Sequence, residues 1–559
     1  MSANAGHCRR RFRHGDFPGK QAPPRVRRRA PSGRWFKFRF GWIAFRLTPV
    51  CHLEEITDMS APSAAPSARQ GHEDTPSVAS TLRAPAALTR EILAGVVTAL
   101  ALVPEVISFS FITGVDPKTA LMSSIVLCLV MSVLGGRPAM VTAAAGSIAL
   151  VVGPMVKMHG VAYILPTILL AGVIQIIFGF TGMARLARFI PRSVMLGFVN
   201  ALGVLIFAAQ VPHLLHVPWA VYPLFALTVA LVLLTPRVTT VIPAPLVAIV
   251  IVTAIAVFGG VAAPNVGGEG DMSPGLPGLT PFLAPLEWRT LAIVWPSALS
   301  VAFVGLLETL LTARLVDEIT DTRSHKGRES WALGVANICA GFWGGVAGCA
   351  MIGQTIVNVK IGAARTRIST VAAGLTLLLL VTALSSVMAR IPMAALAAVM
   401  MIVAVTTIEW RSVNPATLRR MPRSETAVML LTLGVTVATG NLALGVAAGV
   451  LLAFALFARR VAHVVSVERS LSPDGLAVLY TVDGPLFFGS SNDLFERFAY
   501  AADPADVTID FSRAQIWDAS TVAALDAIAS RYRGHGVDVA FSGLDNRSSA
   551  FHARLSGTL

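Results

Sequence analysis

Two carboxylates lie in the middle of apolar segments of this chain. Glu105 lies in the segment 91–114, and Glu308 lies in the segment 297–313. A charged side chain at the centre of a membrane span costs on the order of 3 kcal/mol, so each acid needs a role such as binding a proton or a cation. Thr312 follows Glu308 by one helical turn, which places its hydroxyl on the same face and makes the pair a candidate Na⁺ site. The alternative role is a structural hydrogen bond to a neighbouring helix.

The stretch 344–369, GGVAGCAMIGQTIVNVKIGAARTRIS, has too many small and polar residues for a lipid-facing span. We expect its backbone to break at the glycines and to become helical from about Cys349. The segment 141–155, VTAAAGSIALVVGPM, begins with a similar run of small residues. Broken backbone is tolerated inside a membrane only where it is buried in protein or lines an aqueous cavity. A half-helix start there presents N–H groups, so Ala144 to Ser147 and Ala350 to Gly353 are expected to bind an anion.

The composition is that of an integral membrane protein. Of the 559 residues, 54% are hydrophobic and 14% are charged, and the mean hydropathy is +0.68. The apolar runs are about 20 residues long, which indicates helices and not the strands of an outer-membrane barrel. Fourteen spans are expected, at 91–114, 117–134, 138–157, 161–183, 192–212, 219–235, 238–259, 297–313, 331–342, the broken stretch 344–369, 368–389, 392–408, 425–440 and 442–458.

The order of these spans suggests an internal repeat. Each group of seven has an acid in its first span and a broken third span, and an odd repeat length makes the two copies inverted. With the N-terminus inside, the cytoplasmic loops receive 16 Lys and Arg and the outer loops receive 4. This bias predicts a bacterial-type plasma-membrane protein with both termini in the cytoplasm. The membrane domain is expected at 89–460.

The N-terminal region is expected to be a disordered leader, 1–88. Residues 1–58 hold 13 Lys and Arg against 4 Asp and Glu and contribute much of the net charge of +14. This distribution argues against a nucleic-acid partner; the tail can touch anionic lipids, or it results from a misassigned start with translation beginning at Met59. The five cysteines lack metal-ligand spacing, so no cofactor is expected beyond a coupling ion.

The region 465–559 has the composition of a small α/β domain. The stretch LAVLYTVDGPLFF suggests paired strands, and SNDLFERFAYAA suggests a helix. A strand in DVTIDFSRA, a helix in DASTVAALDAIASRYRGHG, a strand in VDVAFSGL and a final helix follow. We expect this domain in the cytoplasm.

Four stretches resemble the SulP family of inorganic anion transporters: LVPEVISFS, IPRSVMLGFVNALG, VGLLETLLTARLVDEITDTR and the stretch 344–369. The C-terminal domain resembles the STAS domain of that family, with IDFSRAQIWDASTVAALD in place of its hallmark strand, loop and helix. The resemblance covers about residues 85–559. It implies a fourteen-span inverted repeat with core and gate subdomains, a homodimer, and an anion held between the third and tenth helices.

The anion site expected on these grounds consists of residues from three spans. They are Glu105, Phe109, Ala145, Gly146, Ser147, Met351, Ile352, Gly353, Gln354 and Thr355. Many members have glutamine at the position of Glu105, and animal members often have a Ser-Arg pair at Gly353 and Gln354. Ser520 aligns with the serine that is phosphorylated in soluble STAS relatives, so it is a candidate regulatory site.

The leading hypothesis is a secondary active transporter of sulfate, bicarbonate or a dicarboxylate, coupled to H⁺ or Na⁺. One alternative is a membrane-anchored signalling protein whose spans localise the STAS domain. Another is a nucleobase-cation symporter, which has the same type of fold but is not expected to carry a STAS domain. An enzyme is not expected, because the sequence shows no phosphate-binding glycine loop, metal cluster or nucleophile elbow.

Overall fold

A computed structural model describes residues 77–182, 190–238, 242–273, 275, 277–280, 282, 284–285, 287–462 and 464–557. The predicted basic tail 1–58 lies outside these residues, as does the leader up to residue 76. Helical structure begins at α1 (Val78–Arg83), where the Ser77 side chain accepts the N–H of Ser80. The flexible leader predicted up to residue 88 is therefore helical in its last part.

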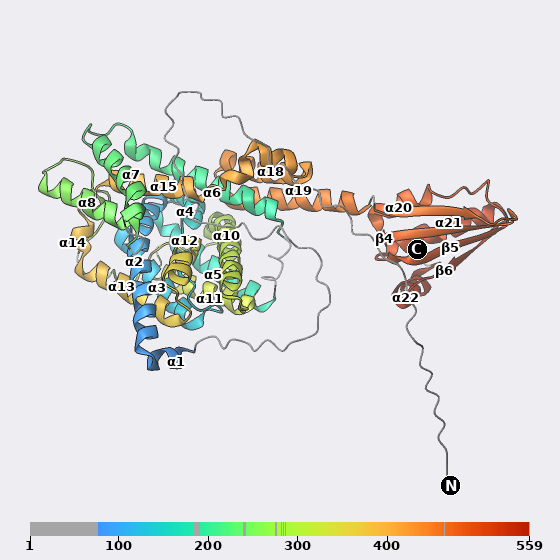
Figure 1. Cartoon of the computed structure of the whole chain (residues 1–559), viewed down its shortest axis with the longest axis horizontal. Helices are drawn as coiled ribbons and strands as arrows, with labels where there is room; N and C mark the ends of the chain where they lie inside the picture. Colours follow the sequence, from blue (N-terminus) through green and yellow to red (C-terminus); the bar gives the residue numbers. More distant parts are fainter. Residues whose placement is uncertain are drawn as a thin grey trace, which may run out of the picture. The chain divides into compact units, whose positions relative to one another are not determined.

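The helices of the membrane domain form two groups that pack mainly within themselves (Figure 1). The first group contains α2 (Pro85–Thr113), α3 (Pro117–Leu134), α4 (Gly146–His159), α5 (Ile164–Phe180), α10 (Trp288–Thr320), α11 (Lys326–Gly341), α12 (Ile352–Ile356), the π-helix η4 (Val357–Ile361) and α13 (Arg367–Ala383). The second contains α6 (Arg192–Gln210), α7 (Val221–Val238), α8 (Ala244–Phe258), α15 (Met393–Thr407), α18 (Arg423–Thr439) and α19 (Leu442–Ala462). Short elements lie between consecutive helices of the chain: η1 (Val161–Tyr163), η3 (Val211–Leu214), α9 (Val266–Glu269), α14 (Ser385–Met388), α16 (Trp410–Val413) and α17 (Pro415–Arg420).

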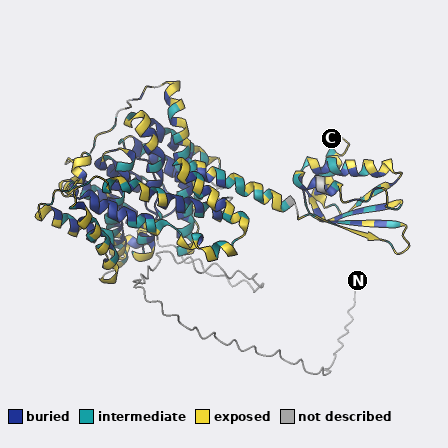
Figure 2. Cartoon of the chain, turned by 90° about the horizontal axis from the view of Figure 1, so that it is seen from above, coloured by how far each residue is buried: buried dark blue, intermediate teal, exposed yellow. Residues whose placement is uncertain are grey.

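Every predicted span contains a helix, although the spans differ in apolar length. Seven described helices are long and apolar enough to cross a membrane alone, and three more are apolar but shorter. Buried residues concentrate in the interior of the helical domain, while its outer helix faces carry exposed apolar side chains (Figure 2). Such exposed apolar faces are expected of a protein that lies in lipid.

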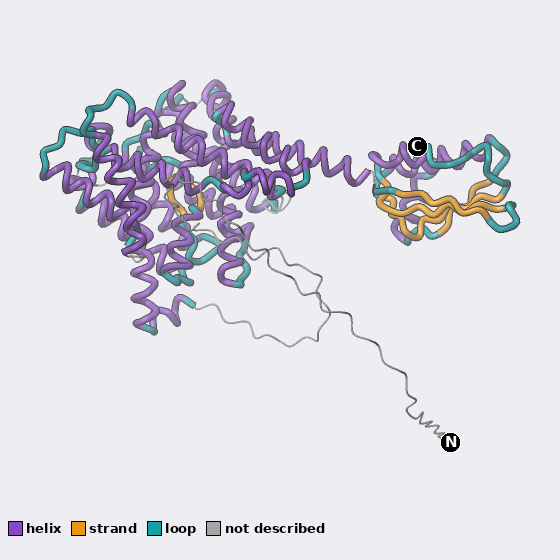
Figure 3. The backbone as a smooth tube through the Cα atoms, turned by 45° about the horizontal axis from the view of Figure 1, so that its top comes forward, coloured by secondary structure: helices purple, strands orange, loops and turns teal. Residues whose placement is uncertain are grey.

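The two broken spans meet in a two-stranded antiparallel sheet surrounded by helices (Figure 3). Strand β1 (Thr142–Ala144) precedes α4, and strand β2 (Gly348–Ala350) precedes α12. The register pairs Ala143 with Cys349. A Cβ atom on Gly348 would lie 2.2 Å from the carbonyl oxygen of Ala143, so glycine is required for this close approach. The prediction that α12 begins near Cys349 is wrong by about one turn, because Cys349 belongs to the strand.

The C-terminal domain is a four-stranded sheet with helices, as predicted. It contains β3 (Ser466–Leu471), β4 (Ala477–Leu486), α20 (Phe488–Phe495), β5 (Asp506–Ile516), α21 (Ala519–Gly534), β6 (Asp538–Ser542) and α22 (Asn546–Leu555). The sheet order is β3-β4-β5-β6, with β3 antiparallel to β4 and the other two pairs parallel. The expected pair of strands within LAVLYTVDGPLFF is wrong: this stretch contains the single strand β4, whose antiparallel partner β3 precedes it.

Candidate functional site

Two half-helices begin at opposite ends of the antiparallel β1–β2 pair. Ala145 is the N-cap of α4, and Met351 is the N-cap of α12. The N–H groups of a helix's first turn have no acceptor within that helix, so Gly146, Ser147, Ile352 and Gly353 present their amides at these ends. The two broken spans are thus brought together as the sequence predicted.

Two of the predicted amide donors are already used by the protein. The Ala144 N–H donates to the Ser124 hydroxyl at 3.1 Å, and the Ala350 N–H donates to the Thr309 hydroxyl at 3.0 Å. Met351 and Thr355 are also engaged, because the Met351 N–H donates to the Val141 carbonyl and the Thr355 hydroxyl accepts the Val141 N–H. These four groups therefore hold the backbone of the site in place and leave anion contacts to the first turns of α4 and α12.

Glu308 joins the two broken spans. Its Oε2 atom accepts hydrogen bonds from the Ser147 hydroxyl, at the start of α4, and from the Cys349 thiol, in β2. The Cys349 Sγ atom lies 2.9 Å from this oxygen. The Thr312 hydroxyl, one turn along α10, donates to the carbonyl oxygens of Glu308 and Ala350 at 2.9 and 3.1 Å. The carboxylate, two hydroxyls and the Ala350 carbonyl give a set of oxygen atoms of the type that hard cations bind.

Side chains cover the edge of β2 that does not pair with β1. The Asn337 side chain accepts the Gly348 N–H at 2.8 Å and donates to the Gly348 carbonyl at 3.3 Å. Thr309 and Thr312 bond the N–H and C=O of Ala350 in the same way. Because alternate residues of a strand point their backbone groups to the same side, these contacts replace a third strand. We name Asn337, Thr309 and Thr312 the edge clamp.

Gln175 supports the edge clamp from α5. The Asn337 Nδ2 atom donates to the Gln175 side-chain oxygen at 2.9 Å, and both residues are fully buried. Sequence reasoning missed Asn337, Gln175, Thr309 and the role of Cys349. The available signal was one amide side chain in each of two apolar spans. Burying an amide in a membrane costs less free energy than burying a carboxylate, so the amide is less conspicuous in the sequence.

Two further pairs of predicted residues contact each other beside α12 and α4. The Gln354 side chain lies beside the Glu105 carboxyl. The Phe109 ring is buried and packs against Gly146, where a Cβ atom would lie 2.6 Å from the ring. Gly353, in contrast, is exposed, and a Cβ atom added there would meet no heavy atom within 4 Å. The start of α12 therefore has room for a small ligand beside Gly353.

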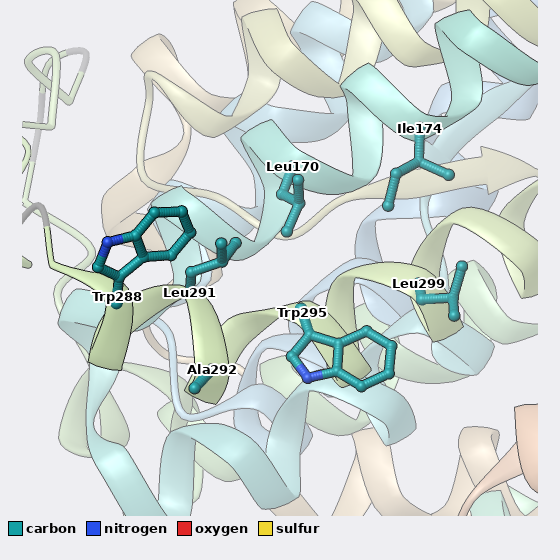
Figure 4. Close-up of a pocket in the computed structure, with 7 residues that line it drawn as sticks. All are labelled: Leu170, Ile174, Trp288, Leu291, Ala292, Trp295 and Leu299. Atoms are coloured by element: carbon teal, nitrogen blue, oxygen red, sulfur yellow. The ribbon is translucent and has the colours of Figure 1, made fainter.

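A separate apolar groove of about 450 Å³ lies between α5 and α10 (Figure 4). Its lining includes Leu170 and Ile174 from α5, and Trp288, Trp295 and Leu299 from α10. All of its lining residues have apolar or amphipathic side chains, so it is not suited to a small anion. It shares no lining residue with the site around Glu308.

Ser520 is exposed in the first turn of α21. The Asp518 side chain caps this helix by accepting the Thr521 N–H at 3.0 Å. The domain is held together on another side by Asp503, which accepts hydrogen bonds from the hydroxyls of Tyr480 and Tyr532 at 2.6 Å each. Burial and these bonds to Asp503 raise the pKa of Tyr532 well above its ordinary value.

Comparison with known proteins identifies both domains. Residues 88–222 and 217–432 match the Sulfate permease family, and residues 470–551 match the STAS domain. The chain is 43% identical over 469 residues to the protein named "Putative sulfate transporter YbaR" of Bacillus subtilis (strain 168). The alignment covers 84% of this chain and 97% of YbaR. It is 25% identical over 455 residues to the bicarbonate transporter BicA of Picosynechococcus sp., covering 71% and 78% of the two chains.

Solved structures share the fold. The structure of SLC26A9 aligns with a TM-score of 0.73 at 16% identity, covering 83% of this chain and 86% of that one. The transmembrane domain of BicA aligns with a TM-score of 0.58 at 22% identity, covering 64% and 97%. This multi-pass membrane protein therefore belongs to the SulP/SLC26 family of anion transporters, which are not enzymes, and it carries a C-terminal STAS domain.

Proposed function

We propose that this protein is a secondary active transporter of a small anion, with sulfate, bicarbonate and a dicarboxylate as the candidate substrates, driven by H⁺ or Na⁺. The observation that carries the proposal is the position of Glu308, whose carboxylate accepts hydrogen bonds from the start of α4 and from β2. One titratable group thus contacts both broken spans. The bacterial relatives named for sulfate and bicarbonate transport support the choice of substrates.

The charges at the site require that an acid be neutralised when the anion binds. Each half-helix start supplies roughly half a positive charge. Glu105 and Glu308 oppose this charge if both are ionised. An anion would then bind poorly, so at least one carboxylate must take up a proton or pair with Na⁺, and we assign this role to Glu308 with Thr312 as its neighbour.

The proposed anion site lies between the starts of α4 and α12. Ala145, Gly146 and Ser147 form one side, Met351 to Thr355 form the other, and Glu105 and Phe109 border it from α2. The open space beside Gly353 supports this placement. Within this group the structure favours the amides of Gly146, Ser147, Ile352 and Gly353 as direct contacts, because Met351 and Thr355 bond to Val141.

The larger arrangement is proposed to be the inverted repeat of seven plus seven spans, with the first helix group as the core and the second as the gate. The equivalent positions of β1–α4 and β2–α12 support this relation. We further propose a homodimer in a bacterial plasma membrane with both termini in the cytoplasm. Ser520 is proposed as a phosphorylation site, since it is exposed and the N-terminus of α21 favours negative charge.

Uptake into proteoliposomes tests the proposal, with labelled sulfate, bicarbonate, succinate and uracil as substrates. Glu308→Gln mimics the protonated acid, so it should retain anion exchange and lose uphill uptake driven by a proton or sodium gradient. Glu105→Gln is the matched control and should alter anion affinity while retaining uphill uptake. If Glu308→Gln concentrates substrate as well as the parent does, the coupling role of Glu308 is wrong.

A further inference from the structure

A cavity of about 650 Å³ lies where α5 ends and α11 begins. Its lining includes Phe180 at the end of α5, Gly182 just after that helix, and the 324–328 stretch that leads into α11. The two helices approach each other closely here, because a Cβ atom on Gly179 would lie 2.6 Å from the backbone nitrogen of Trp331. The charge bias of the loops predicts that this end of the helix bundle faces the cytoplasm.

The region around the cavity carries more positive than negative charge. The Arg328 guanidinium donates to the Leu134 and Val133 carbonyls at 2.8 and 3.3 Å, so its partners are neutral. Arg367 likewise donates to backbone carbonyls at the end of α3. The described charged side chains that act on one another here are five cations and two carboxylates, besides His325: Arg137, Lys326, Arg328, Arg365 and Arg367, with Asp317 and Glu329.

The carboxylates do not neutralise the cavity wall. Asp317 pairs with both Lys326, at 2.7 Å, and Arg137, at 3.1 Å, so it is shared between two cations. Glu329 is fully buried and accepts the backbone N–H groups of Gly136 and Arg137. Arg328 therefore keeps an excess positive charge at the lining of the cavity.

An apolar stripe on α5 leads to the same cavity. Val173, Ile177 and Phe180 follow one another at helical spacing, and each is exposed. Phe180 is 75% exposed and stacks on Trp331 with ring centroids 6.1 Å apart and an angle of 7° between the planes. An exposed aromatic at a membrane interface suits the glycerol and acyl region of a lipid, whereas a free ion gains nothing from it.

We propose that this cavity binds an anionic phospholipid of the inner leaflet. The phosphate lies against Arg328 and His325, and the chains follow Val173 and Ile177 along α5. Basic pockets between membrane helices on the cytoplasmic side are suited to such headgroups. The occupied site would hold the start of α11, the helix that also carries Asn337 of the edge clamp.

The test measures lipid binding to the full-length protein in nanodiscs of phosphatidylcholine, with and without added phosphatidylglycerol. We expect phosphatidylglycerol to bind the parent selectively and to raise its melting temperature. Arg328→Gln should weaken this binding about fivefold, the effect expected for one basic residue near a membrane surface. His325→Glu changes an exposed residue and should weaken it at least as much without disturbing the contacts of Arg328 to α3.

Arg323→Gln is the matched control, since Arg323 is exposed in the same loop but does not line the cavity. An equal loss of binding in Arg323→Gln would show a general surface charge effect and overturn the proposal. A second arm adds inorganic phosphate to phosphatidylcholine nanodiscs. If phosphate alone raises the melting temperature as much as phosphatidylglycerol does, the cavity is a free-anion site and the lipid assignment is wrong. Phe180→Ala should weaken the binding of phosphatidylglycerol and leave any effect of inorganic phosphate unchanged.

Discussion

Replacing Asn337 by leucine tests whether the edge clamp holds β2 in the position that transport requires. Leucine has a similar volume but no hydrogen-bonding atoms, so the change leaves three buried groups without their present partner: the N–H and C=O of Gly348 and the side-chain oxygen of Gln175. A buried polar group left unsatisfied costs about 1–3 kcal/mol. The three together predict a loss of about 3–9 kcal/mol, which corresponds to a factor of more than 100 in a two-state equilibrium.

The loss can appear either as lower global stability or as displacement of β2 alone. Melting in detergent measures the first, and anion exchange in proteoliposomes at matched protein amounts measures the second. Gln175→Leu is the graded control, because it removes only one of the three bonds and leaves both contacts of Asn337 to Gly348 intact. We expect its effect to be about a third as large in free energy. A parental melting temperature together with a parental exchange rate in Asn337→Leu would refute the clamp.

Further predictions concern single residues and whole segments. Gly348→Ala places a methyl group 2.2 Å from the Ala143 carbonyl oxygen and should abolish anion exchange. In Gly353→Ala the added methyl group has no heavy atom within 4 Å, so this variant should fold normally, with any change confined to the KM for the anion. Thr312→Ser should retain melting temperature and uptake, while Thr312→Val orphans the Ala350 carbonyl and should lower both. Removal of the chain after Ser466 should weaken uptake and leave the order of anion preference unchanged; an altered order would place part of the site in the STAS domain. Deletion of residues 1–58 should leave membrane insertion and uptake at parental levels.

The broken spans were predictable from the sequence because small residues and glycines shorten the apolar length of 141–155 and 344–369. The strands were not, since Thr142–Ala144 and Gly348–Ala350 are each three residues long and lack an alternating pattern. Their pairing joins segments from the two halves of the chain, and only the fold brings them together. The sequence therefore predicts a helix start near Cys349, about one turn before α12 begins at Ile352.

The acids and the amides of the site differ in how visible they are in a sequence. Glu105 and Glu308 stand out because ionised groups are costly in a membrane. Asn337 and Gln175 are neutral and satisfy each other across two helices, so their cost is smaller and their partners cannot be inferred from spacing. Cys349 behaves as a small buried residue, and its contact with Glu308 depends on the strand register.

The edge clamp changes how the proposed coupling to Glu308 can work. The sequence predicts Thr312 as a candidate cation ligand, and its hydroxyl also donates to the Ala350 carbonyl and so holds β2. Glu308 accepts bonds from Ser147 and Cys349, which belong to the two different broken spans. A proton placed on the accepting oxygen turns it into a donor, and one of these two bonds must then rearrange. On this proposal, uptake of the coupling ion changes a contact between Glu308 and one of the two broken spans, and the anion bound between the half-helix starts would respond to that change.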